Sequence, residues 1–338
     1  MLRASLNAQK RQAITFDAVK KHILELWDAP VEPPTWLSPT KAHKGTTGVP
    51  TLFCSDWHWG EVVKPHEIDG VNEYNIEIAQ KRVRKLWERA QHLLFETIKD
   101  PKYDGIVIPL GGDMVTGDIH EELAKTNDAP IMPTVLDLIE TIVWLLTQAA
   151  EKFGRVYVPC VTGNHGRSTY KIQYKERGPT SFDWLAYHCI ERALRHDKRI
   201  TFQIPDGPDI LYKVYNHSYL LTHGDQFRGG DGMIGALGPI MRGSHKKQSR
   251  NATLNRGFST MIVGHWHQLI QLQKLVVNGA LKGYDEYAYG NNFSYERASQ
   301  ALWVTHPKRG ITLQMPVYVD EEAPAQAAPW ISLSPKTR

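Results

Sequence analysis

Two histidines, His265 and His267, follow the short apolar run 261–263 with one residue between them. Such a pair alone is more often accidental than a metal site. Four further polar clusters also stand directly after short apolar runs: Asp56-Trp57-His58, Gly112-Asp113, Gly163-Asn164-His165 and Thr222-His223-Gly224-Asp225. Carboxylate, amide and imidazole groups bind divalent metal ions. Five strand ends that carry these groups therefore predict a metal-ligand set.

The chemistry that this set predicts is hydrolysis of a phosphate ester by two metal ions. Two divalent ions need a shared anionic ligand, and Asp113, from the middle of the set, is the natural bridge. Such a pair binds the ester through two oxygens and lowers the pKa of a bound water, which then attacks. No side-chain nucleophile is required, and the sequence has neither a Gly-x-Ser-x-Gly elbow nor a phosphate-binding loop ending in Gly-Lys-Ser/Thr.

Strands that alternate with helices must position the first three clusters. Helical periodicity covers residues 76–98, 133–150 and 181–196, and each stretch follows one of the first three strands. This alternation predicts a layered α/β fold. From residue 200 onwards short strand-like runs dominate, so the second half of the chain is expected to be mostly β.

The chain divides into a core domain with an extension at each end. We expect a helix (residues 11–27) and a proline-rich linker within residues 1–45, one domain over 46–318, and a mobile tail at 319–338. Residues 227–256 form a glycine-rich basic insertion with six Lys or Arg against one acid, Asp231. This insertion is expected to be irregular, because its six glycines interrupt any periodic pattern.

Composition indicates a globular protein with a substantial core, since 41% of the residues are hydrophobic. The net charge of +4 is compatible with a polyanionic substrate. The three cysteines lack metal-finger spacing and are read as core thiols of a reducing compartment. We find no secretory leader and expect no bilayer-spanning run. A cytoplasmic protein without a membrane partner is therefore expected.

The order of the five clusters resembles that of the calcineurin-like metallophosphoesterase superfamily: D-x-H, G-D, G-N-H, H-G and G-H-x-H. The resemblance spans roughly residues 51–317. It implies two packed mixed β-sheets flanked by helices, as αββα layers, with a di-metal site at one end. It also assigns seven metal ligands, which are Asp56, His58 and His267 for the first ion, Asp113 as the bridge, and Asn164, His223 and His265 for the second.

The resemblance assigns a catalytic role to His165, which matches a histidine beside the scissile phosphate. That residue stabilises the developing charge or protonates the leaving oxygen. The superfamily usually has an acid next in the chain that orients this histidine, but here Gly166 and Arg167 follow. Asp118 or Asp225 is the candidate substitute. Arg167 either contacts a phosphate oxygen or is a surface residue near the site.

The ligand set does not identify the phosphoester. Most candidate substrate contacts lie in residues 227–256, which begin and end beside metal-site motifs. Its cations suit a nucleic acid backbone and Phe227 suits base stacking, whereas the alternatives are a lid or a loop with incidental charge. The full set of candidate contacts is Arg167, Phe227, Arg228, Arg242, Lys246, Lys247 and Arg250.

These features favour a two-metal phosphodiesterase that acts on DNA as a nuclease. Residues 112–117 also resemble the DNA-associated branch of the superfamily, which includes repair nucleases and polymerase small subunits. Mn²⁺ is the expected metal, with Fe or Zn²⁺ as alternatives. One alternative function is a phosphoesterase for small nucleotides. Another is a non-catalytic binding subunit of a replication or repair assembly, against which the intact ligand set counts. A protein partner could dock on the terminal extensions, but nothing identifies one.

Overall fold

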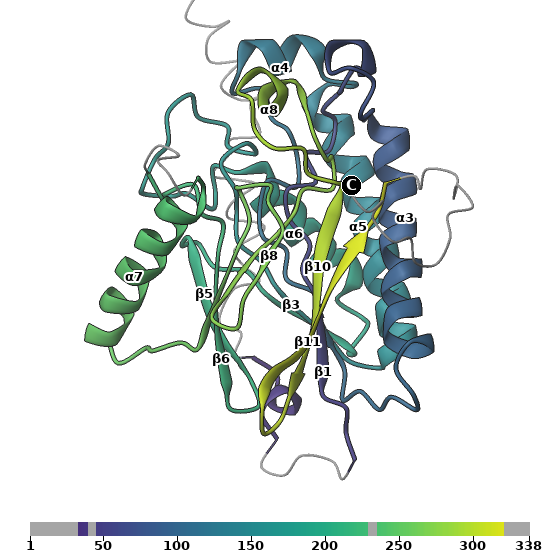
Figure 1. Cartoon of the computed structure of the whole chain (residues 1–338), viewed down its shortest axis with the longest axis vertical. Helices are drawn as coiled ribbons and strands as arrows, with labels where there is room; N and C mark the ends of the chain where they lie inside the picture. Colours follow the sequence, from purple (N-terminus) through teal and green to yellow (C-terminus); the bar gives the residue numbers. More distant parts are fainter. Residues whose placement is uncertain (1–32, 40–44, 229–234, 321–338) are drawn as a thin grey trace, which may run out of the picture.

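The structure is a computed structural model that describes residues 33–39, 45–228 and 235–320 (Figure 1). The helix expected at residues 11–27 and nearly all of the tail expected at 319–338 lie outside these ranges.

Two mixed β-sheets form the centre of the described residues. In the first sheet, of order β11-β10-β1-β2-β3-β4, strands β1 to β4 run parallel and β10 and β11 are antiparallel to their neighbours. In the second, of order β5-β6-β7-β9-β8, β6, β7 and β9 run parallel and both edge strands are antiparallel. The strands of the first sheet are β1 Val49–Leu52, β2 Ile106–Val107, β3 Val156–Pro159, β4 Ile200–Gln203, β10 Ser299–His306 and β11 Gly310–Tyr318. Those of the second are β5 Asp209–Val214, β6 His217–Thr222, β7 Thr260–Val263, β8 Ile270–Gln271 and β9 Leu275–Val277.

Helices connect and cover these strands. Their ends follow the local sequence, since Asn75 caps α3, Ser181 caps α6, and Gly154 with φ 72° ends α5. The α-helices are α3 Ile76–Gln91, α4 Glu121–Thr126, α5 Ile131–Phe153, α6 Phe182–Leu194, α7 Leu237–Thr253 and α8 Glu286–Gly290. Short 3₁₀ turns occur at η1 Thr35–Leu37 and η2 Pro65–Glu67, and a π-helical turn at η3 His92–Glu96 continues α3.

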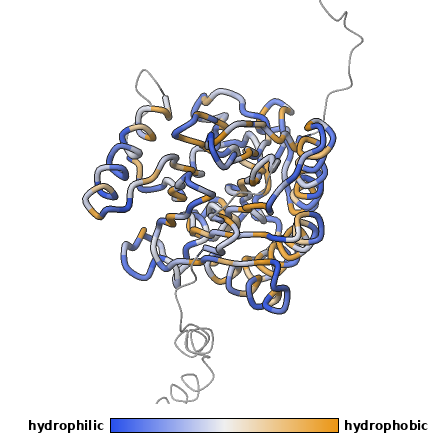
Figure 2. Tube along the Cα trace, turned by 90° about the horizontal axis from the view of Figure 1, so that it is seen from below, coloured by the Kyte–Doolittle hydropathy of each residue, from blue (hydrophilic) through white to orange (hydrophobic). Residues whose placement is uncertain are grey.

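Alternation along the central strands builds two hydrophobic layers from one sheet. In β3, Val156 and Val158 face a core formed with α3, α5 and α6, whereas Tyr157 faces the second sheet. In β7, Ile262 returns that contact and Met261 points to the outer side. The hydrophobic stretches of the chain accordingly gather towards the inside of the molecule (Figure 2). The predicted fold of two packed mixed sheets flanked by helices is confirmed.

Helix α7 corrects the expectation that residues 227–256 are irregular. Residues Leu237–Thr253 form a helix on the outer side of the second sheet, opposite α3 and α5 (Figure 1). Pro239 lies in the first turn, where a missing N–H costs nothing, and Gly243 lets the ring of Phe227 pack against the helix. The glycines and the proline therefore fit a helix that the sequence pattern conceals.

Helix α5 also departs from the expectation that no apolar run could span a bilayer. By length and composition alone, Ile131–Phe153 would be able to cross a membrane. In the structure Leu138, Ile142 and Leu145 are buried in the main core. A core helix of a globular domain passes the same test, so length and composition alone do not distinguish the two.

Candidate metal centre

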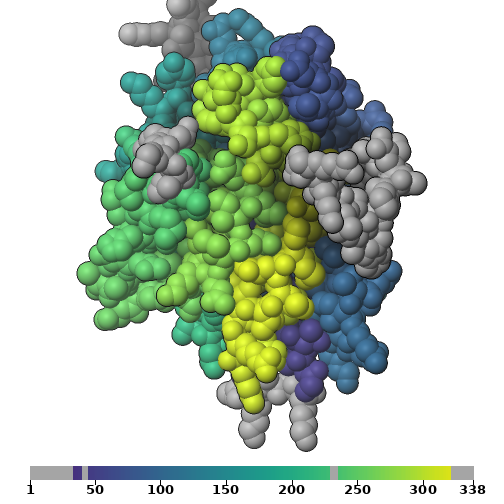
Figure 3. Space-filling model, viewed as in Figure 1, coloured from purple at the N-terminus to yellow at the C-terminus, as the bar shows by residue number. Residues whose placement is uncertain are grey.

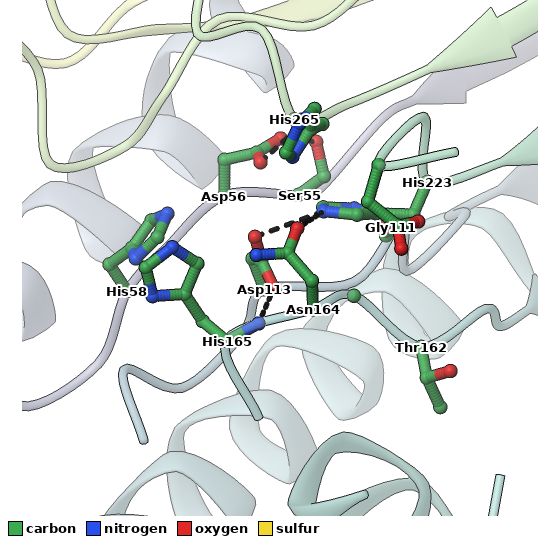
Figure 4. A network of polar contacts seen from close by, with 12 residues as sticks. Ser55, Asp56, His58, Gly111, Asp113, Thr162, Asn164, His165, His223 and His265 are labelled. Atoms are coloured by element: carbon green, nitrogen blue, oxygen red, sulfur yellow. Dashed lines mark hydrogen bonds and ion pairs between the residues drawn. The ribbon is translucent and has the colours of Figure 1, made fainter. Parts of the chain in front are cut away.

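The five polar clusters of the sequence meet at one end of the two sheets (Figure 4). The clusters that begin at Asp56, Gly112 and Gly163 follow β1, β2 and β3, which run parallel, so their carboxyl ends lie side by side. The other two follow the parallel strands β6 and β7 of the second sheet. The Asp56 carboxylate links the loops of the two sheets here, since it accepts the backbone N–H of His265 at 2.8 Å.

Sharp backbone turns aim the predicted ligands into this space. Of the eleven described non-glycine residues with positive φ, five are predicted ligands, namely Asp56, His58, Asp113, His265 and His267. Each such conformation costs on the order of 1–3 kcal/mol, and conformations of this kind concentrate at functional sites. In both Asp56-x-His58 and His265-x-His267 the turned residues are two apart, so both side chains of each pair enter the same site.

Glycines allow the loops of the centre to approach one another closely. A Cβ atom on Gly163 would lie 2.1 Å from Asp113 Oδ1, and one on Gly264 would lie 2.5 Å from Asp56 Oδ2. Any side chain at either position would displace a predicted ligand. Steric exclusion of a side chain thus explains why glycine occupies these two positions of the motifs.

Asp56, His58 and His267 form the first group of candidate ligands. The Nε2 atoms of His58 and His267 are 3.1 Å apart, and His267 Nε2 lies 3.5 Å from Asp56 Oδ1. Asp56 and His58 are buried, whereas the side chain of His267 is 30% exposed. One carboxylate oxygen and two imidazole nitrogens therefore converge on a single point that is open on one side.

Asp113, His223 and His265 form the second group. His223 Nε2 lies 2.9 Å from Asp113 Oδ2 and 3.2 Å from Asn164 Oδ1, so the amide of Asn164 joins this group. The other carboxylate oxygen of Asp113 accepts the backbone N–H of His165 at 2.7 Å. Asp113 is thus held rigidly from both sides.

The donor set fits divalent ions. Within each group of Asp and His residues the ligand atoms lie within 4.8 Å of one another, and carboxylate with imidazole suits first-row metals. Burial acts to raise the pKa of Asp113, but His223 and His165 outweigh it and hold that pKa well below its usual range. Burial likewise acts to lower the pKa of His223, but Asp113 raises it to about 10. A cation that binds this pair would displace the proton of His223.

Partners behind the ligands orient their imidazole rings. His223 Nδ1 lies 2.8 Å from the carbonyl oxygen of Gly111, which directs Nε2 at the centre. His58 Nδ1 lies 3.0 Å from Thr116 Oγ1 and 3.2 Å from Glu61 Oε2. The Glu61 carboxylate is neutralised in turn by Lys282, whose Nζ lies 2.6 Å from Glu61 Oε1. These contacts point the free nitrogens of both rings at the site.

Asp183 is a buried carboxylate of this centre that the sequence reasoning missed. It lies in the first turn of α6 and accepts four backbone N–H groups, from Asp113, Met114, Val115 and Gly163, at 2.9–3.4 Å. Burial and the nearby Asp113 carboxylate raise the pKa of Asp183 to about 6. The residue therefore ties the loop of Asp113 to the loop of Asn164.

The environment of His165 differs from the two expectations for its orienting acid. Asp118 is exposed, and Asp225 forms a 2.8 Å ion pair with Arg177, so neither fills that role in the structure. A Cβ atom on Gly166 would lie 3.0 Å from Asp183 Oδ1, so Asp183 borders the space that an acid at position 166 would enter. Among the described residues, His165 Nδ1 is buried and has no hydrogen-bond partner.

The predicted substrate contacts are spread over different environments. The ring of Phe227 is 8% exposed and packs in the core beneath α7, so this ring presents no platform for a base. Lys247 and Arg250 both contact Asp209, each at 2.5 Å. Arg242 and Lys246 are exposed on the outer face of α7. The structure therefore corrects the stacking role expected for Phe227.

The two remaining candidates lie near the third motif. The Arg167 guanidinium donates to the backbone carbonyls of Asn164, Thr169 and Tyr170 at 2.6–3.3 Å, which fixes its own loop. Arg228 Nη2 lies 3.4 Å from the hydroxyl oxygen of Tyr174 in the same loop. Both cations thus contact the segment that leaves the centre after His165.

No family model and no curated protein matches this sequence. Similar solved structures include a conserved uncharacterized protein from Streptococcus pneumoniae described as a predicted phosphoesterase, with 10% identity, TM-score 0.29, 79% of this chain and 95% of that one. A Vps29 double mutant from Entamoeba histolytica has 11% identity, TM-score 0.32, 80% and 99% coverage. A putative 5'-nucleotidase from Staphylococcus aureus has 10% identity, TM-score 0.33, 82% and 55% coverage. At TM-scores this low the likenesses carry no argument, and the function must be argued from the site.

Proposed function

We propose that this chain is a calcineurin-like phosphoesterase that hydrolyses its substrate with two divalent metal ions. The observation that carries the proposal is the pair of adjoining ligand groups at one end of the sheets, built from five loops in the predicted order. The proposed ligands are Asp56, His58, Asp113, Asn164, His223, His265 and His267. Mn²⁺ is the metal proposed for both positions, because mixed carboxylate, amide and imidazole ligands suit it.

The residues of the centre would divide the work of the reaction. Two ions bound there would polarise the phosphate oxygens and lower the pKa of a water molecule. Asp113 is proposed as the shared ligand, because its carboxylate lies 2.9 Å from His223 Nε2 of the second group and its backbone carbonyl accepts the N–H of His58 of the first group at 3.0 Å. The Glu61 and Thr116 contacts of His58 would keep its ring aimed inward throughout.

His165 is proposed as the residue that acts on the leaving oxygen. Its ring centre lies 4.7 Å from that of His58, and its buried Nδ1 has no partner among the described residues. A ring in this position is able to donate a hydrogen bond to charge that develops on a substrate oxygen. An unpartnered buried nitrogen is costly unless a ligand completes it.

We further propose that the substrate is a phosphodiester of DNA. The support is electrostatic, because Arg242 and Lys246 are exposed on the outer face of α7 and the net charge is +4. The pairing of Lys247 and Arg250 with Asp209 reduces the basic surface expected from sequence, but does not remove it. The complete ligand set favours a catalyst over a non-catalytic subunit.

A metal-dependent cleavage assay tests both levels of the proposal. Full-length protein with Mn²⁺ would receive end-labelled DNA, a chromogenic phosphodiester and a phosphomonoester. The Asp113→Asn variant is the inactive control, and Asp118→Asn, which alters an exposed carboxylate nearby, is the matched active control.

Cleavage of DNA and of the chromogenic diester by the parent, but not by Asp113→Asn, is the expected result. Turnover of the monoester alone would replace the nuclease proposal with a small-molecule phosphatase. Failure to cleave any substrate although two ions bind would overturn catalysis and favour a binding subunit.

A further inference from the structure

Exposed aromatic side chains are concentrated beside the metal centre. Within the described ranges seven aromatic residues have strongly exposed side chains, and six of them lie on two loops that leave the site. The seventh, Tyr318, lies at the end of β11. The six are Tyr170, Tyr174, Tyr287, Tyr289, Phe293 and Tyr295, with exposed fractions between 36% and 84%. Aromatic rings are usually largely buried, and a group of exposed rings often marks a binding surface.

The first loop, residues 167–180, begins directly after His165. A small cavity behind it is lined by Asn164 of the centre and by Ile172 of the loop. The loop carries the dipeptide Tyr-Lys twice, at residues 170–171 and 174–175, and all four side chains are exposed. Aromatic faces and positive charges therefore alternate along its surface, the combination by which proteins hold bases and phosphates of a flexible strand.

The second loop, residues 279–298, is tied to the other side of the centre. The backbone N–H of Leu281 donates to the carbonyl of Asp56 at 3.1 Å, and Lys282 joins Asp285 to Glu61 behind His58. The part of this loop that contains α8 projects at the top of the molecule (Figures 1 and 3). Residues 281–285 therefore anchor this loop beside the first group of ligands, and the exposed rings lie further along it.

The rings of the second loop form a supported cluster. Ring centres of Tyr287 and Phe293 are 5.9 Å apart, and those of Tyr284 and Tyr295 are 5.5 Å apart. The Tyr289 hydroxyl donates to the Asp69 carboxylate at 2.6 Å. Rings held by such contacts lose little further freedom when a flat group stacks on them, which lowers the entropy cost of binding.

We infer that the two aromatic loops are a stacking platform for unpaired bases, so that the site selects a single-stranded nucleic acid. The inference rests on the proposed function, because the metal centre would hold the phosphodiester between the loops. Every unpaired base offers a face to an aromatic ring, whereas bases of a duplex already stack on one another. Lys171 and Lys175 supply charge for the phosphates, and the second loop contributes mainly rings.

Binding measured without cleavage tests this inference. The full chain carrying Asp113→Asn would be titrated, by fluorescence anisotropy, into a dye-labelled twelve-nucleotide single strand, its duplex, and an abasic strand of equal length. The platform variants are Tyr170→Ala/Tyr174→Ala and Tyr287→Ala/Phe293→Ala. Tyr318→Ala is the matched control, and Tyr170→Phe/Tyr174→Phe retains both rings should the alanine variant disturb the loop.

Each pair of alanines is expected to weaken single-strand binding about tenfold or more, since stacking on one ring is worth several-fold in affinity. The phenylalanine pair and Tyr318→Ala should bind like the parent, and the parent should prefer the single strand to both the duplex and the abasic strand. Equal binding of the normal and abasic strands, or unchanged binding by both alanine pairs, would overturn the inference.

Hydrolysis of the chromogenic diester separates this inference from the proposed function. Introduced into the active chain, the same alanine pairs should leave that activity unchanged, because the small ester needs no stacked base. If the diester is hydrolysed but the alanine pairs do not change strand affinity, the platform is wrong and the proposed hydrolase activity is retained. If the parent hydrolyses neither substrate but the alanine pairs still weaken strand binding, the proposed hydrolase activity is wrong and the platform is retained.

Discussion

Two clusters of charged side chains in this protein are built in opposite ways. On the outer side of the second sheet, Asp209 contacts Lys247 and Arg250 at 2.5 Å each, so anion and cations complete one another. In the metal centre the carboxylates face imidazoles and backbone N–H groups, and the Nε2 atoms of His58 and His267 point at each other across 3.1 Å. The charges of the first cluster neutralise one another, whereas the second brings together donor atoms that suit a divalent cation.

The backbone shows the same contrast. Asp209, Lys247 and Arg250 belong to a regular strand and a regular helix, but five predicted ligands of the centre have positive φ. Strain of this kind must be offset by contacts elsewhere in the fold or by a bound ligand. We expect the Asp209 cluster to stabilise the fold and the metal centre to serve function at some cost in stability.

The largest effect is expected when the centre loses its proposed shared ligand. Asp113→Asn should lower phosphodiester hydrolysis at least about a thousandfold. The neutral amide does not bridge two cations as a carboxylate does, and it supplies no negative charge to offset theirs. Equilibrium dialysis followed by metal analysis should give two Mn²⁺ per parent chain and fewer in the variant. Two tightly held ions in an inactive Asp113→Asn protein would show that this carboxylate acts in some other way.

The complementary change is expected to affect stability alone. Asp209→Asn leaves Lys247 buried without its anion and should lower the free energy of unfolding by about 3 kcal/mol. Metal content and hydrolysis per folded molecule should remain at parent levels. Urea unfolding at neutral pH measures the loss, and a variant as stable as the parent would show that the Asp209 cluster does not stabilise the fold.

The pH dependence of that difference has a definite sign. Burial acts to raise the pKa of Asp209, but Lys247 and Arg250 outweigh it and lower that pKa. A carboxyl group with a lowered pKa stabilises the fold above its unfolded value of about 4 and loses this contribution as pH falls through the folded value. The gap between parent and Asp209→Asn should therefore be full at neutral pH and shrink below about pH 4.

Asp183 combines the two roles, because it is buried in the fold and also positions the proposed ligands. In Asp183→Asn, one acceptor oxygen becomes an NH₂ group that faces backbone N–H donors. Mn²⁺ affinity should fall about 10–100-fold, the usual cost of losing a partner behind the ligands. Ser181→Ala removes the cap of the same helix and is the control, since it should cost about 1 kcal/mol of stability without weakening metal binding. Equal losses of affinity in both variants would make Asp183 a purely structural residue.

The contrast also explains which features the sequence reveals. Apolar runs of strand length that end in Asp, Asn or His are local patterns, and parallel pairing then brings the ends together, so β1, β2, β3, β6 and β7 were all predictable. Asp183 was not, because it resembles an ordinary first-turn acid seventy residues away from the Asp113 N–H it binds. Helix α7 was hidden because Gly238, Pro239 and Gly243 look like breakers until the packing of Phe227 and the first-turn position of the proline are known.

The smallest effect is expected on the outer face of α7, where the cations Arg242 and Lys246 are exposed to solvent. Arg242→Gln/Lys246→Gln should weaken DNA binding a few-fold at low salt and reduce the slope of log affinity against log salt by about 1.5, because each phosphate contact contributes 0.7–0.9 to that slope. Hydrolysis of the chromogenic diester should not change. Affinity measured at several salt concentrations in the Asp113→Asn background provides the slope.

Lys308→Gln/Arg309→Gln is the matched control for that experiment. It removes the same charge from the turn between β10 and β11, and the pairing of Thr305 with Val49 places this turn at the end of the first sheet opposite the metal centre. If α7 follows the strand, the slope changes only for the α7 pair. Equal changes in both variants would mean that DNA affinity depends only on the net charge of the protein. No change in either would assign α7 to the architecture of the second sheet and leave recognition to the loops at the centre.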